Sequence, residues 1–103
     1  MNAIPTGAFK CYLEALINKV YKILPMYEEE NKNLRSYLQS LEREMSGCYQ
    51  LYKSVCDDAQ FLSLISIISY LHTEEYTQQV CKQEVFKAIH IIEGMVERTG
   101  ENG

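Results

Sequence analysis

An apolar residue recurs at alternating steps of four and three over more than half of this chain, from Phe9 to Leu62. Such steps average about 3.5 residues, close to one helical turn, so these residues share one stripe of an α-helix. A stripe of this length needs another helix packed along it. This apolar ladder consists of Phe9, Leu13, Leu16, Val20, Ile23, Tyr27, Asn31, Leu34, Leu38, Leu41, Met45, Cys48, Tyr52, Val55, Ala59 and Leu62.

Helix-breaking and helix-capping residues divide the chain. Pro25 lacks an amide donor, so it predicts a kinked or broken helix with two roughly collinear halves. Gly47 follows a periodic run and favours a turn, although a glycine inside a helix would cost only about 1 kcal/mol. Asp57 begins a sequence that resembles a capping box and offers a second boundary. Thr73, followed by two glutamates, predicts the start of the last helix.

These boundaries predict helices at 7–24, 25–46, 48–71 with a break near Asp57, and 74–99. The segment from Met26 to Ser46 is the most regular. With no alternating strand pattern, the fold class is all-α, a small antiparallel bundle of three to four helices. The 103 residues suit a single domain over 1–103, with 1–6 and 100–103 frayed.

Composition excludes several function classes. The net charge is −4 and the sequence has no basic run, so binding to nucleic acid or to an anionic membrane surface is not expected. A basic protein partner fits this charge better. No stretch has the length of a membrane span or the pattern of a signal peptide, so we expect a soluble, cytoplasmic protein. The four cysteines match no zinc framework and are expected to be reduced and at least half-buried.

Two histidines are the nearest approach to catalytic or metal chemistry. His72-x-x-Glu75 and His90-x-x-Glu93 each place an imidazole and a carboxylate on one helix face. Helical carboxylate metal proteins use the reverse order, Glu-x-x-His, with further carboxylates from other helices. Most other glutamates, including Glu42 and Glu44, fall opposite the ladder and are expected to face water. We therefore expect no catalysis, no cofactor and no metal. A metal-binding or enzymatic bundle using His72, His90 and nearby glutamates is the alternative.

The remaining apolar and tyrosine side chains favour protein binding. Asn31 occupies a ladder position, where it could set the register of paired helices, or it could simply be hydrated outside the packed region. Tyrosines beside the ladder could cover an interface or fringe the core. We predict a non-catalytic protein–protein interaction module (an adaptor, a structural subunit or a small inhibitor) that self-associates as a homodimer. The predicted interface residues are Tyr27, Asn31, Leu34, Tyr37, Phe86 and Ile91.

Overall fold

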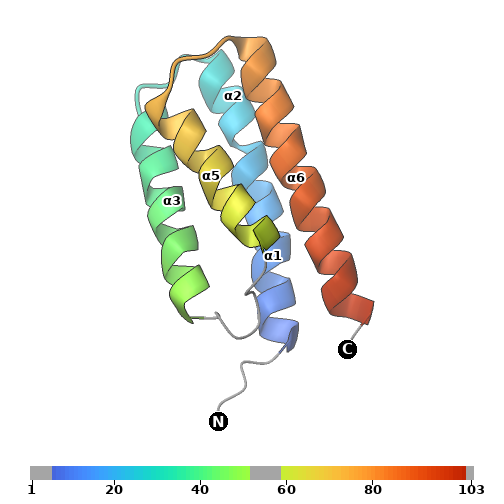
Figure 1. The fold of residues 1–103 in the computed structure, drawn as a ribbon. Helices are drawn as coiled ribbons and strands as arrows, with labels where there is room; N and C mark the ends of the chain where they lie inside the picture. The colour runs from blue at the N-terminus through green and yellow to red at the C-terminus, as the bar shows by residue number, and fades with distance from the viewer. Residues whose placement is uncertain (1–5, 52–58, 102–103) are drawn as a thin grey trace.

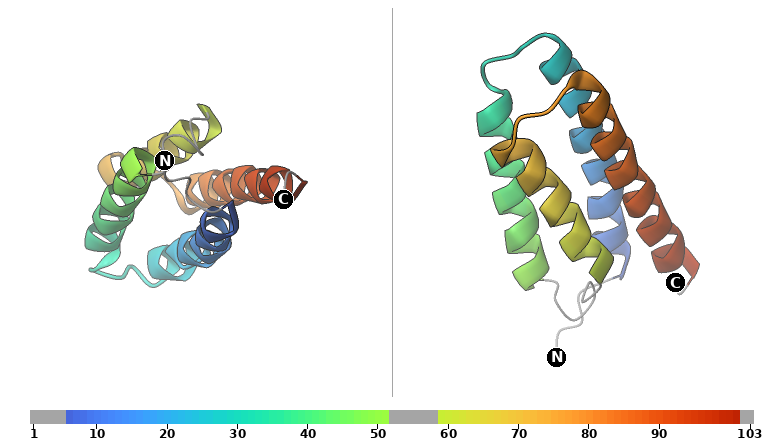
Figure 2. Two further views of the ribbon diagram at one scale, coloured as in Figure 1. Left: turned by 90° about the horizontal axis from the view of Figure 1, so that it is seen from below. Right: turned by 45° about the horizontal axis from the view of Figure 1, so that its top comes forward.

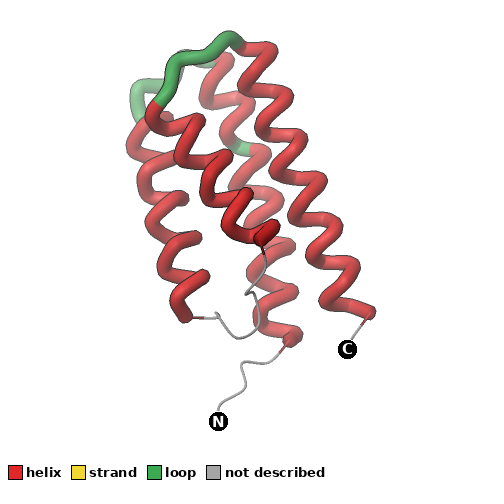
Figure 3. The backbone as a smooth tube through the Cα atoms, viewed as in Figure 1, coloured by secondary structure: helices red, strands yellow, loops and turns green. Residues whose placement is uncertain are grey.

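A computed structural model describes residues 6–51 and 59–101 of the chain. Over these residues every regular element is a helix and no strand is present, which confirms the all-α class (Figures 1 and 3). The helices are α1 (Thr6–Tyr21), α2 (Ile23–Glu28), α3 (Leu34–Leu51), α5 (Ala59–Thr73) and α6 (Gln78–Glu101).

The helices form an elongated antiparallel bundle of 44 × 22 × 19 Å. α1 and α2 follow one another along one side, and α6 runs beside both in the opposite direction (Figure 1). α3 and α5 pack against each other, and α5 also contacts α6. Two further views show the same arrangement, with α6 beside α1 and α2, and α3 beside α5 (Figure 2).

The core confirms the apolar ladder as the buried stripe from Phe9 to Ile23 and from Leu38 to Cys48. These two parts lie on α1, α2 and α3, and the inner faces of α5 and α6 complete the interior. The ladder is wrong at its end, because Ala59 and Leu62 are exposed on α5. No polar or charged residue is buried within the described part of the chain. Core residues expose at most 8% of their surface: Phe9, Leu13, Leu16, Val20, Ile23, Leu38, Leu41, Met45, Cys48, Phe61, Leu64, Ile67, Ile68, Leu71, Cys81, Val85, Ala88, Ile89, Ile92 and Met95.

The first helical segment is broken into α1 and α2 close to Pro25, as predicted. α1 ends at Tyr21, α2 begins at Ile23, and Pro25 lies in the first turn of α2. Pro25 has no amide hydrogen to donate to the carbonyl of Tyr21, so the regular helix breaks one turn before the proline. The amide of Lys22 still donates to Asn18 O at 3.2 Å, and the two pieces stay in line.

The predicted continuous helix over 25–46 is wrong, because the chain reverses direction between Glu28 and Leu34. Asn31 N donates to Met26 O at 2.9 Å, and Glu30 N donates to Tyr27 O at 3.1 Å. These two bonds form a Schellman motif, whose left-handed position is usually glycine. Here Glu30 occupies it with φ 55°. The reversal was missed because a glutamate carries no turn signal.

The predicted turn at Gly47 is also wrong, since α3 continues through Gly47 to Leu51. A Cβ at Gly47 would meet nothing within 4 Å, so no close contact requires a glycine there. The predicted break near Asp57 lies outside the described residues, and α5 begins at Ala59.

The predicted start of the last helix at Thr73 is wrong by one turn. α5 runs through Thr73, whose hydroxyl donates to Ser69 O at 2.9 Å. α6 begins at Gln78, and the Thr77 hydroxyl accepts a hydrogen bond from Val80 N at 3.2 Å. Thr77 is therefore the N-cap residue, and residues 74–77 form the linker between α5 and α6.

Candidate interaction surfaces

A cleft of about 410 Å³ lies at the end of the bundle where the turn after α2 meets the linker of residues 74–77. Leu34, Leu38 and Leu71 contribute apolar side chains to it. Its other lining residues are Tyr27, Asn31, Lys32, Arg35, His72, Glu74, Glu75 and Tyr76. Two cations and two anions thus share one opening, and the cleft has no strong preference for either sign of charge.

Stacked tyrosines hold the linker beside this cleft. The Tyr76 ring stacks on Tyr27 with centroids 5.4 Å apart and on Tyr70 with centroids 5.7 Å apart. The Tyr27 hydroxyl donates to Tyr76 O, and the Tyr76 hydroxyl donates to Leu71 O, both at 2.5 Å. Burial is the main cause that raises the pKa of Tyr76 to about 12. These contacts of Tyr76 therefore hold the linker against α2 and α5.

Two charged residues near His72, Arg35 and Glu42, make contacts within the protein. Arg35 Nη1 donates to His72 O at 2.9 Å, which satisfies a carbonyl at the C-terminal end of α5. His72 Nδ1 is enclosed and lies 3.3 Å from Glu42 Oε1, although this contact lacks hydrogen-bond geometry. Glu42 therefore turns toward α5 rather than facing only water, which corrects the prediction for this residue.

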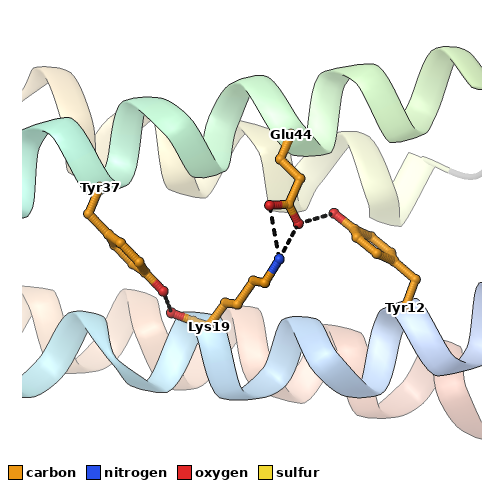
Figure 4. A network of polar contacts seen from close by, with 4 residues as sticks. All are labelled: Tyr12, Lys19, Tyr37 and Glu44. Atoms are coloured by element: carbon orange, nitrogen blue, oxygen red, sulfur yellow. Dashed lines mark hydrogen bonds and ion pairs between the residues drawn. The ribbon is translucent and has the colours of Figure 1, made fainter.

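A polar seam of four residues, Tyr12, Lys19, Tyr37 and Glu44, joins α1 to α3 (Figure 4). Glu44 accepts hydrogen bonds from Lys19 Nζ at 2.8 and 2.9 Å and from the Tyr12 hydroxyl at 3.1 Å. The Tyr37 hydroxyl donates to Lys19 O at 2.7 Å. Burial, followed by the charge of Glu44, raises the pKa of both Tyr12 and Tyr37. Glu44 therefore turns toward α1 rather than facing only water, which corrects the prediction for this residue.

The outward face of α5 carries no charge. The helix contains no Asp, Glu, Lys or Arg, and its exposed side includes Leu62, Ser63, Ser66 and Tyr70. Leu62 is 45% exposed and Tyr70 is 37% exposed. Leu62, Ser66 and Tyr70 are spaced four residues apart, so they form one stripe along the helix. We call this stripe, together with Ser63, the α5 face.

A second apolar surface lies where α1 meets α6. Tyr21 is 43% exposed and Phe86 is 47% exposed. Their rings meet edge to face, with centroids 6.1 Å apart and an interplanar angle of 81°. Both rings thus pair with each other while each keeps nearly half of its surface open. We call these two residues the aromatic pair.

The six predicted interface residues fall in four different places. Tyr27, Asn31 and Leu34 line the cleft. Tyr37 lies in the polar seam. Phe86 belongs to the aromatic pair, and Ile91 packs partly buried against the core from α6. Asn31 also shapes the turn, because its Oδ1 accepts a hydrogen bond from Asn33 N at 2.8 Å.

Sequence reasoning missed the α5 face as a surface. In the sequence, the stretch from Phe61 to Leu71 is apolar nearly all round apart from its serines, a pattern typical of a buried helix. Only the packing shows that α5 has neighbours on part of its circumference, so that Leu62 and Tyr70 remain exposed. The signal that could have identified the face is the complete lack of charge on its outer residues.

The structure separates the two histidines of the alternative hypothesis. His72 lies in the last turn of α5, whereas His90 is exposed halfway along α6 beside Glu93. No group of three or more His, Cys, Asp or Glu side chains suited to a metal ion occurs in residues 6–51 and 59–101.

The cysteines differ in accessibility. Cys48 and Cys81 are buried, and burial raises the pKa of Cys81 to about 11. Cys11 is exposed, which corrects the expectation that it is at least half-buried. Cys56 lies outside the described residues.

Comparisons with known proteins found no relative. No family model, no curated protein and no solved structure matches this chain. Among the described residues, no helix combines the length and the apolar character that crossing a bilayer requires.

Proposed function

We propose that this protein is a protein–protein interaction module that acts by binding rather than catalysis and that associates with itself through the α5 face. The observation that supports this most directly is the uncharged exposed stripe of Leu62, Ser66 and Tyr70. Exposed parts of the other long helices carry charged residues, such as Glu14 on α1, Arg43 on α3 and Glu93 on α6.

Two copies of this face suit each other. The exposed serines let two helix backbones approach closely, and Leu62 and Tyr70 supply the apolar area that drives association. A twofold dimer brings the same patch of both subunits together, and a patch without charge meets no repulsion. α5 has 15 residues and is about 22 Å long, so its face alone is smaller than a standard interface. We therefore expect a reversible dimer that forms at high protein concentration.

Sedimentation equilibrium over a range of concentrations tests this proposal. The natural chain should dimerise, and Ser66→Arg should be monomeric because the new charges face each other. Gln39→Arg adds the same charge on an exposed position of α3 and should still dimerise. Circular dichroism confirms that each variant is folded. A natural chain that stays monomeric at millimolar concentration, or a dimer that Ser66→Arg leaves intact, would refute the proposal.

The same kind of surface would serve an adaptor, a structural subunit or a small inhibitor. In each of these roles the protein presents a rigid helix face to another chain. Affinity capture from the native cell, with Ser66→Arg as the comparison bait, separates partners that use the α5 face from those that do not.

A further inference from the structure

The aromatic pair is a second surface whose local charge differs from that of the whole chain. The protein carries a net charge of −4. Within one helical turn of Phe86 on α6, however, the outer positions are Lys82, Gln83 and His90, all exposed. Lys22 follows Tyr21 directly and is exposed as well. The surroundings of the two rings are therefore basic or neutral.

Acidic side chains on the same helix faces begin about two turns away. Glu14 precedes Tyr21 by seven residues, and Glu28 follows it by seven residues and accepts a hydrogen bond from Gln78 on α6 at 2.9 Å. Glu93 follows Phe86 by seven residues on α6. Asn18 and Pro25, one turn from Tyr21 on either side, are exposed and uncharged. A ligand seated on the rings thus meets positive charge before negative charge.

We propose that the aromatic pair docks an acidic amphipathic segment of another protein, with apolar side chains on the two rings and carboxylates toward Lys22 and Lys82. Half-exposed aromatic rings bordered by polar residues are typical anchor points of protein interfaces. Charge complementarity with the two lysines favours a segment of negative charge. It also disfavours a second copy of this chain, since a twofold contact would bring the lysines of both copies together.

This surface lies on α1 and α6, so the proposal does not rest on self-association through α5. The test is selection of peptides from a library of random dodecapeptides on the immobilised full chain, followed by fluorescence anisotropy of the selected peptides. We expect enrichment of peptides that combine Asp or Glu with aromatic or leucine residues. Their affinity should fall as salt is raised, because salt screens the attraction to the lysines.

Variants locate the binding site. Phe86→Gln should lower the affinity for the selected peptides at least about tenfold, as expected for an aromatic anchor. Leu62→Gln, on the α5 face, should leave their affinity unchanged and serves as the matched control. Lys82→Glu should also weaken binding, whereas Arg43→Glu, with the same charge change on exposed α3, should not. Circular dichroism verifies the fold of each variant.

Several outcomes would overturn the proposal. They are the absence of enriched peptides, enrichment of basic or uncharged peptides, and binding that Phe86→Gln leaves intact. Cosedimentation with vesicles of phosphatidylcholine and phosphatidylserine tests a membrane as the occupant instead. Vesicle binding that depends on Phe86, without acidic peptide binding, would replace the proposed protein segment with an anionic lipid surface.

Discussion

Replacing Glu44 with alanine removes the hydrogen bonds by which this carboxylate joins α3 to α1 (Figure 4). Because Glu44 is not part of the apolar ladder, a purely periodic interpretation predicts almost no effect. The structure predicts a measurable loss, since Lys19 and the Tyr12 hydroxyl both lose their acceptor.

The size of the expected loss in the free energy of unfolding depends on how exposed the bonded side chains are. The Lys19 and Glu44 side chains remain 43% and 36% exposed, so water and salt screen their ion pair, and we assign it about 0.5 kcal/mol. The Tyr12 hydroxyl is half-buried and donates to a charged acceptor, which we set at about 1 kcal/mol. Glu44→Ala should therefore lower the free energy of unfolding by about 1.5 kcal/mol, which corresponds to a fall in Tm of roughly 6–12 °C.

Urea unfolding followed by circular dichroism measures this loss. Glu93→Ala, at an exposed position of α6, is the control and should change the free energy of unfolding by less than about 0.5 kcal/mol. A double-mutant cycle with Tyr12→Phe should give a coupling energy of about 1 kcal/mol. Equal effects of the two alanine substitutions, together with zero coupling to Tyr12, would refute the polar seam.

Three further predictions concern a glycine, a tyrosine and the cysteines. Gly47→Ala should raise the free energy of unfolding by about 1 kcal/mol in urea, because alanine suits a helix interior better; a loss would indicate a turn. The pKa of Tyr76 is raised to about 12, so its contribution to stability is complete below about pH 10 and is lost as pH rises toward 12. In the Tyr76→Phe variant, the free energy of unfolding should therefore fall less steeply with pH between about 10 and 12, as followed by circular dichroism. An unchanged dependence on pH would contradict the burial of the Tyr76 hydroxyl. Iodoacetamide should modify Cys11 in the native protein, and Cys48 and Cys81 only after unfolding, as read by peptide mass spectrometry. Rapid native modification of Cys81 would contradict the packing of α6.

The surfaces could be anticipated only in part. Phe86 was predicted at an interface because it lies off the main stripe of its helix, and the structure leaves it 47% exposed. Tyr27, on the apolar ladder, and Tyr37, beside it, were also predicted at an interface, but their hydroxyls bond to backbone carbonyls within the same chain. Position on a helix indicates which side chains leave the core stripe, but it does not show whether another segment covers them.

The spacing of apolar residues was sufficient to identify the helical class and most of the core, because side-chain direction along a helix depends only on local backbone geometry. Leu13, Leu41 and Met45 are buried as that spacing requires. The reversal at Glu30 could not be seen this way. A left-handed glutamate costs about 1–2 kcal/mol locally, and such a cost is compensated only by contacts distant in sequence, among them the stack of Tyr27 on Tyr76. Which faces remain exposed is likewise a property of the assembled bundle, because the exposure of a helix depends on the helices beside it.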